Sequence, residues 1–396
     1  MPALTSADVN AVARPATGLA LWCARQSVVA GAEAPPLQDM ERDDWIDFLR
    51  LAQPHGILPI AWTALRPYTD SMDAAAAADL RQAYEANARH NLTMLGELHA
   101  LTTALAAQGI RALSWKGAVL AQRAYGDIAA RQFFDLDLLV PRNQIAAAQS
   151  VADSLGFRPE KRMADHEQEA YVDHQGELEL VRPSDGLWVE LHSAVVPTYY
   201  GRAQPSDEWW PRAVEVRFGR LRIAALDPID ELQALCIHGS KHRWDRLAWI
   251  LDIAMLGRGL DDAQWSDAIA AATRHGTLRM LRLGLLLAAD LCAAPIPAEV
   301  LGAARRDRAA LKLARTVEAA LFDPSPSRFD GLVFHAQMRE RASDRLRYLA
   351  SVTFTPSGAD WESLRLPRVL FPLYAVTRPV RLAAKYGRRL VSPPRD

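Results

Sequence analysis

The chain has 396 residues, half of them hydrophobic, which is enough for two or three domains with a substantial core. Its 46 lysines and arginines and 47 aspartates and glutamates nearly balance, which argues against a protein-wide electrostatic attraction to nucleic acid or to an anionic membrane but leaves room for local basic patches. Three widely separated cysteines argue against a disulfide framework or a zinc knuckle, and no apolar run reaches the length of a membrane span, so we expect a cytoplasmic protein with no membrane partner.

The first hundred residues have a helical pattern. Apolar side chains recur at three- and four-residue spacing in the segment 43–53, and the segment 73–108 predicts one long helix that ends at Gly109. We therefore expect residues 1–100 to form a helical N-terminal region.

A strand followed by a helix is expected directly after Gly109. The segment "IRALS" at 110–114 predicts a short strand, and "KGAVLAQRAY" at 116–125 predicts a helix that begins near Lys116 and Gly117. Backbone N–H groups at such a helix start, together with the lysine, suit phosphate oxygens. An alternative interpretation is that Lys116 is a structural surface lysine.

The next strand carries two aspartates within an apolar run, "FFDLDLLV" at 133–140. Alternate side chains of a strand share a face, so Asp135 and Asp137 are neighbours on one face. Two adjacent anions repel, and a divalent cation such as Mg²⁺ or Mn²⁺ would relieve the repulsion. The pair could instead be the polar side of an edge strand, but Arg131 just before it adds a possible phosphate donor and favours the metal interpretation.

A third carboxylate is expected from a β-hairpin further along the chain. The segments 176–182 and 187–193 flank four turn residues, and the strands between 110 and 193 predict one mixed sheet. Glu190 is the candidate because its strand carries polar and apolar side chains on opposite faces. Glu177 and Glu179 on the partner strand alternate in the same manner and are rivals for this role.

The chain becomes helical again after residue 225. Read as one helix, the segment 238–254 places His238, His242, Asp245, Trp249 and Asp252 along one stripe. From this stripe Lys241 and His242 could reach phosphate. Two other interpretations are a zinc site at His238 and His242, which lacks the glutamate of an HExxH motif, and a helix that only packs against the sheet.

The C-terminal segment from Arg365 to Arg395 holds seven arginines and one lysine and no acidic residue. It is compatible with binding of RNA or another anionic acceptor. It is equally compatible with a final helix whose arginines cover acidic segments of the same chain, which is the interpretation that we favour. Before it, "FDPSPSRFDG" at 322–331 has the composition of a linker.

Several motifs stand in a recognisable order along the chain. They are "SWKGAVLAQRAYGD", Arg131, "DLDLLV" and "LHS", and later "HGSKHRWDRLAWILDIAML" and "LPRVLFPLYAVTRPVRLAAKYGRR". Together they resemble the uncharacterised nucleotidyltransferase family, within the DNA polymerase beta-like nucleotidyltransferase superfamily, and the likeness covers most of the chain from about Leu101 onward. The broader superfamily differs in that its Gly-Ser or Gly-Gly pair lies nearer the aspartates than Lys116 and Gly117 do here.

The resemblance implies an α+β fold, with a polymerase beta-like core at 101–225 between helical N-terminal (1–100) and C-terminal (226–396) regions. It implies that Asp135, Asp137 and Glu190 hold two Mg²⁺ or Mn²⁺ ions, and that an NTP, with ATP as the expected nucleotide, gives its NMP to an acceptor with release of pyrophosphate. The acceptor stays open among a small-molecule hydroxyl, a peptide, a protein side chain and RNA. A rival interpretation is a catalytically silent nucleotide-binding or scaffold protein with the same fold.

Overall fold

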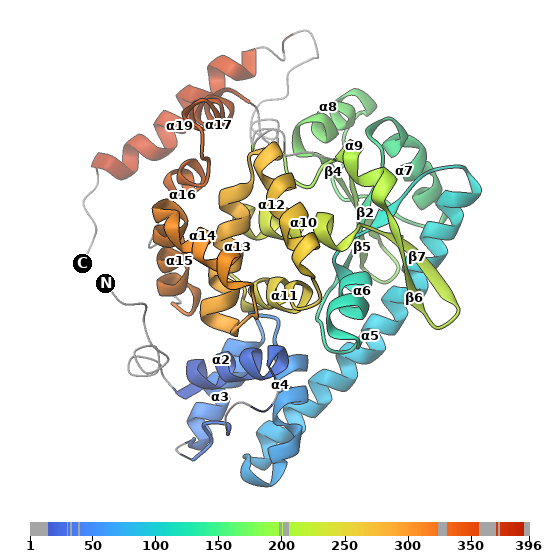
Figure 1. Ribbon diagram of the computed structural model, residues 1–396. Coiled ribbons are helices and arrows are strands. Elements are labelled where there is room, and N and C mark those ends of the chain that lie inside the picture. Colours follow the sequence, from blue (N-terminus) through green and yellow to red (C-terminus); the bar gives the residue numbers. More distant parts are fainter. Residues whose placement is uncertain are drawn as a thin grey trace.

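The computed structural model describes residues 15–29, 31, 34–38, 40–197, 200, 206–323, 331–355, 370 and 373–391. Within these ranges a mixed sheet lies beside a large set of helices (Figure 1). The N-terminal helices are α2 (Pro15–Val28), α3 (Arg42–Ala52), α4 (Leu58–Leu65), the short 3₁₀ helix η1 (Arg66–Ser71) and the long helix α5 (Ala74–Ala107). The long helix that the sequence predicts is thus confirmed.

The sheet has seven strands in the order β3-β4-β5-β2-β1-β7-β6. The pairs β2 with β5 and β1 with β7 are parallel and the other pairs are antiparallel, so the sheet is mixed as predicted. The strands are β1 (Leu113–Ser114), β2 (Asp135–Leu139), β3 (Arg158–Pro159), β4 (Glu177–Arg182), β5 (Leu187–His192), β6 (Val214–Phe218) and β7 (Leu221–Ala225). The predicted hairpin corresponds to β4 and β5 and is confirmed.

Short helices connect the strands. Two of them follow β1, two follow β2, one lies between β3 and β4, and two lie between β5 and β6. The bounds are α6 (Gly117–Leu120), the π-helical turn η2 (Ala121–Tyr125), η3 (Arg142–Gln144), α7 (Ile145–Ser154), α8 (Asp165–Gln175), α9 (Ser206–Trp209) and η5 (Trp210–Arg212).

The two faces of the sheet have different chemistry. Leu136, Leu138 and their neighbours on β5 pack with the apolar sides of α5 and α7 into one hydrophobic cluster. The opposite face carries Asp135, Asp137 and Leu139, as the two-residue period of a strand requires. Of these, Leu139 belongs to a second hydrophobic cluster, so the carboxylates lie beside a packed region and not on an open surface.

That second cluster joins the helices before the sheet to those after it. The C-terminal helices are α10 (Pro228–Lys241), α11 (Leu247–Gly257), α12 (Asp262–His275), α13 (Leu278–Cys292), α14 (Ala298–Arg306), α15 (Arg308–Leu321), α16 (Gly331–Gln337), α17 (Ala342–Phe354) and α19 (Tyr374–Val391). The cluster contains side chains of α2, α3 and α4 together with side chains of α10, α11 and α13. Among the described helices, none is both long and apolar enough to cross a bilayer.

The prediction of one continuous helix over 238–254 is wrong. Helix α10 ends at Lys241 and α11 begins at Leu247, because Arg243 and Trp244 take left-handed backbone conformations with φ of 58° and 57°. The buried ring of Trp244 fills the space beside Gly239 and Gly284, which favours this turn over a further helical turn. The predicted stripe is therefore divided between two helices.

The basic C-terminal segment is described only in part. Its helix, α19, packs against α17, and the Arg378 Nε donates a hydrogen bond to the Val352 carbonyl. Residues 365–369, 371–372 and 392–396 lie outside the described residues, as do residues 324–330 of the expected linker. These contacts test neither the favoured interpretation, in which the arginines cover acidic segments of the same chain, nor the alternative of binding RNA or another anionic acceptor, so both stay predictions.

Candidate active site

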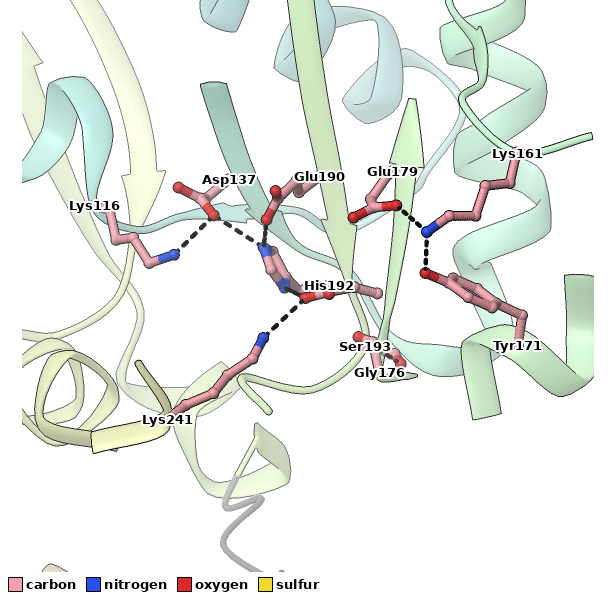
Figure 2. A network of polar contacts seen from close by, with 11 residues as sticks. Lys116, Asp137, Lys161, Tyr171, Gly176, Glu179, Glu190, His192, Ser193 and Lys241 are labelled. Atoms are coloured by element: carbon pink, nitrogen blue, oxygen red, sulfur yellow. Dashed lines mark hydrogen bonds and ion pairs between the residues drawn. The ribbon is translucent and has the colours of Figure 1, made fainter. Parts of the chain in front are cut away.

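The candidate site lies on the polar face of the sheet, where β1, β2, β5 and β4 meet. In the parallel pair β2 and β5, Asp137 is the direct partner of Glu190, and Asp135 is the partner of Trp188. In the antiparallel pair β4 and β5, Glu179 is the partner of Glu190. The sheet therefore places Asp137, Glu190 and Glu179 in one row, with Glu190 in the middle (Figure 2).

Lys116 contacts this row from the end of β1. Its ammonium lies 3.0 Å from Asp137 Oδ1 and 3.9 Å from the centre of the Trp115 ring. Its backbone has φ 57° and ψ −145°, a conformation that residues with a side chain rarely adopt and that costs of order 1–3 kcal/mol. Its N–H donates to the buried carboxylate of Glu231 at 3.0 Å, which helps hold this strained geometry.

Gly117 follows the strained lysine with φ 42° and begins α6. A residue with a Cβ would be strained at this angle, which accounts for glycine here. The predicted pair Lys116 and Gly117 thus lies at a helix start beside Asp137. The structure does not test their predicted contact with phosphate.

His192 lies between the carboxylates. Its Nε2 is 2.9 Å from Asp137 Oδ1 and 3.1 Å from Glu190 Oε2 (Figure 2). Its Nδ1 is 3.5 Å from Glu177 Oε2. The ring is buried and meets the Trp115 ring edge to face, with the centroids 5.4 Å apart. The imidazole is therefore enclosed by acidic groups on two sides and by an aromatic ring on another.

The two aspartates have opposite electrostatic environments. Burial raises the pKa of Asp135, and the neighbouring charge of Asp137 adds to this, so that the pKa reaches about 6. Burial also acts to raise the pKa of Asp137, but the charge of Lys116 and the hydrogen bond from His192 outweigh it and hold that pKa well below its usual range. Asp137 is thus ionised at neutral pH and surrounded by cations.

The pKa of His192 reflects the same environment. Burial acts to lower it, but hydrogen bonds to Asp137 and Glu190 dominate and raise it to about 9. The pKa of Glu190 is lowered, because its hydrogen bond with His192 outweighs burial. With no metal ion bound, a proton on His192 supplies positive charge between the two carboxylates.

Arg131 is buried and pairs with Asp252 of α11. Its Nε and Nη2 donate to the two carboxylate oxygens at 2.8 and 2.9 Å, and the Tyr125 hydroxyl donates to the same carboxylate at 2.7 Å. This bidentate pair joins the start of β2 to the C-terminal helices. The predicted phosphate contact of Arg131 stays a prediction, since two of its guanidinium nitrogens already donate to Asp252.

Lys241 and His242 lie at the end of α10. The Lys241 ammonium is 3.8 Å from Glu177 Oε2, which places it at the edge of the same polar network (Figure 2). The His242 ring packs at a tilt against His238 and Trp249, with ring centroids 4.6 and 5.2 Å away, and burial lowers the pKa of His242 to about 4. The His242 ring is therefore neutral at physiological pH and packs among aromatic rings.

One group among the described residues has the geometry of a metal site. Ligand atoms of Asp137, Glu190 and His192 all lie within 4.8 Å of one another, whereas His238 and His242 belong to no such group in the described part of the chain. The donor chemistry fits a divalent ion, because two carboxylates offer hard oxygens and the imidazole offers one nitrogen. Asp135 lies on the same strand face outside this group, and the charge of Asp137 contributes to its raised pKa.

The comparison with known families agrees with this geometry. The family described as uncharacterised nucleotidyltransferase matches residues 41–293, more than half of the chain. The chain belongs to this family. The match includes all the strands of the described sheet and every predicted site residue. No curated protein matches the chain.

Two residues of the candidate site do not follow from the sequence. The two-residue period of a strand puts His192 on the face of Glu190, but no pattern indicates that its ring lies between two carboxylates. Glu231 binds the Lys116 N–H from more than a hundred residues away, so only the tertiary structure reveals it. The acidic residue three positions after Pro228 was the only signal, and it is common at helix starts.

Proposed function

We propose that the protein is a metal-dependent nucleotidyltransferase that moves an NMP from an NTP, with ATP as the expected donor, to an acceptor hydroxyl or similar group. The observation that supports this most strongly is the direct pairing of Asp137 with Glu190 across β2 and β5, with the Lys116 ammonium at the same carboxylate. Family membership supports the same class of reaction.

We assign Asp135, Asp137 and Glu190 to hold Mg²⁺ or Mn²⁺. When bound, such ions stabilise the entering and leaving oxygens at the α-phosphate. The Asp137 side chain is almost fully buried, so the residues around it fix the position of this ligand at the base of the site. The Glu190 side chain is 26% exposed, so it can meet an acceptor that approaches from solvent.

The remaining predicted residues would bind the nucleotide. Lys116 and the N–H groups near Gly117 would contact the triphosphate, with Lys241, His242 and Arg131 as further candidates. The acceptor oxygen forms a bond to the α-phosphorus while the bond to the oxygen that bridges the α- and β-phosphates breaks. Pyrophosphate leaves with that oxygen, and the acceptor proton passes to a nearby carboxylate, a role that we assign to Glu190.

The test uses the full-length protein with each α-labelled NTP in turn, Mg²⁺ or Mn²⁺, and a cell extract as the source of acceptor. We expect label transfer that disappears when Asp135→Asn and Asp137→Asn are combined. Label transfer by this double variant would contradict the metal assignment. Saturable NTP binding without any transfer would favour the catalytically silent nucleotide-binding protein.

A further inference from the structure

His192 occupies the centre of the polar face and makes contacts that the transfer reaction itself does not require. On the basis of the proposed function above, we propose that His192 is a nitrogen ligand of the divalent ion, oriented by Glu177, and that this donor set gives the centre a preference for Mn²⁺ over Mg²⁺. The His192 residue is only 2% exposed, so contact with bulk solvent does not account for a polar side chain at this position.

The distances around Nε2 match those between adjacent ligands of one ion. For octahedral coordination with bonds of about 2.1 Å, neighbouring ligand atoms lie about 3.0 Å apart. Nε2 is 2.9 Å from the oxygen of Asp137 and 3.1 Å from that of Glu190. One ion placed among these three atoms would therefore need little movement of the side chains.

The other ring nitrogen has the environment that metal-binding histidines require. A histidine that binds a metal through one nitrogen almost always donates its second N–H to a carboxylate, a carbonyl or water, which fixes the ring. Here Nδ1 is buried and makes no hydrogen bond with any described residue, but Glu177 Oε2 lies 3.5 Å from it. A small rotation would close this bond and direct Nε2 at the ion.

Neighbouring groups hold this arrangement in place. The Lys241 ammonium lies 3.8 Å from the same oxygen of Glu177, and the edge-to-face contact with Trp115 restricts the ring of His192. Glu177 is therefore a positioning residue and not a rival for the third carboxylate. Glu179 is also otherwise engaged, because its Oε2 accepts a hydrogen bond from Lys161 at 3.0 Å.

The presence of a nitrogen donor favours one metal over the other. Mg²⁺ prefers oxygen ligands and retains several waters. Mn²⁺ also suits oxygen ligands but, as a first-row transition ion, is a softer acid and binds an imidazole nitrogen more readily than Mg²⁺ does. A centre made only of carboxylates has no nitrogen donor and so would not favour Mn²⁺ over Mg²⁺ for this reason. His192 would therefore increase the affinity for Mn²⁺ relative to that for Mg²⁺.

The test is pulsed electron paramagnetic resonance of Mn²⁺ bound to the full-length protein without nucleotide. We expect coupling of the electron spin to a directly bound ¹⁴N nucleus, which changes to ¹⁵N coupling when the protein contains ¹⁵N-labelled histidine. In His192→Gln the nitrogen coupling should disappear, and the ratio of Mn²⁺ to Mg²⁺ affinity should fall about tenfold or more. The control His99→Gln, on α5, should retain both the nitrogen coupling and the ratio of Mn²⁺ to Mg²⁺ affinity.

The outcomes separate this inference from the proposed function. Suppose that Mn²⁺ binds to the wild-type protein without nitrogen coupling and that Asp137→Asn abolishes this binding. This result overturns the role of His192 and leaves the carboxylate centre intact. Mn²⁺ binding that is unaffected by Asp137→Asn overturns the carboxylate centre itself. Isotope labelling needs no variant, so the test stands even where His192→Gln fails to fold. Glu177→Gln should keep the nitrogen coupling and weaken Mn²⁺ binding.

Discussion

The ammonium of Lys116 lies 3.0 Å from Oδ1 of Asp137, and the two residues are 21 positions apart in the sequence. This contact joins the strained start of α6 to the most buried carboxylate of the candidate site. In the function that we propose, this ammonium contacts the phosphates of the nucleotide, so substitutions of Lys116 should weaken nucleotide binding.

Lys116→Met should raise the KM for the NTP about tenfold or more, because a charge-assisted hydrogen bond contributes about 1.5–3 kcal/mol. Steady-state kinetics of label transfer measures this. Lys161→Met is a matched control. Lys161 also forms an ion pair with a carboxylate of this sheet face, but with that of Glu179 and not with that of Asp137. A folded Lys116→Met protein with an unchanged KM would contradict the phosphate role.

Asp252→Asn should lower the free energy of unfolding by about 3 kcal/mol, because it leaves the buried guanidinium of Arg131 without its charged partner. Urea denaturation measures this. The control is Glu215→Gln, which breaks the exposed pair with Arg222 and should change stability by less than about 1 kcal/mol. Equal effects of the two substitutions would show that Arg131 and Asp252 do not anchor the site.

Gly239→Ala should destabilise the protein by about 1–3 kcal/mol, because the new Cβ would lie 2.6 Å from the Trp244 ring. Thermal unfolding measures the change. Gly96→Ala is the control: Gly96 is an exposed glycine of helix α5 whose added Cβ would meet nothing within 4 Å, so this substitution should stabilise slightly. A Gly239→Ala protein as stable as the control would mean that Trp244 does not fix the turn between α10 and α11.

Glu318 should make stability depend on pH. Burial and the nearby charge of Asp290 raise the pKa of Glu318 from 4.5 to about 7. The folded state then binds the proton more tightly than the unfolded state, so its contribution to stability is present below pH 4.5 and is lost as the pH rises toward 7.

Glu318→Gln should therefore be more stable than the wild-type protein by about 1 kcal/mol at pH 8, with a smaller difference at pH 4. Chemical denaturation at the two pH values measures this. Glu299→Gln, at an exposed position of α14, should give no such difference. A stability gain for Glu318→Gln that is the same at both pH values would contradict the raised pKa.

Local patterns predicted much of the sheet and its polar face. The two-residue period of a strand placed Asp135 and Asp137 together and opposite Leu136 and Leu138, and the turn residues between 182 and 187 predicted the hairpin that brings Glu190 to the same face. These features depend only on neighbours in the sequence. The sequence could therefore indicate which carboxylates share a face before any tertiary structure was known.

Features that depend on distant contacts were not predicted. The break after Lys241 follows from the fit of the Trp244 ring beside Gly239 and Gly284, which lie on different helices. The strained backbone of Lys116 depends on Glu231, and the position of His192 depends on three strands at once. No periodicity in the sequence carries this information, because each feature is fixed by packing between separate elements.

The most direct test of the proposed transfer is to measure labelled product and pyrophosphate together, with an α-labelled NTP and Mn²⁺. We predict that the two appear in equal amounts, and that Asp137→Asn reduces both about 100-fold or more while Glu215→Gln leaves them unchanged. Release of orthophosphate in place of pyrophosphate, or full activity of Asp137→Asn, would contradict a nucleotidyltransferase centred on Asp137 and Glu190.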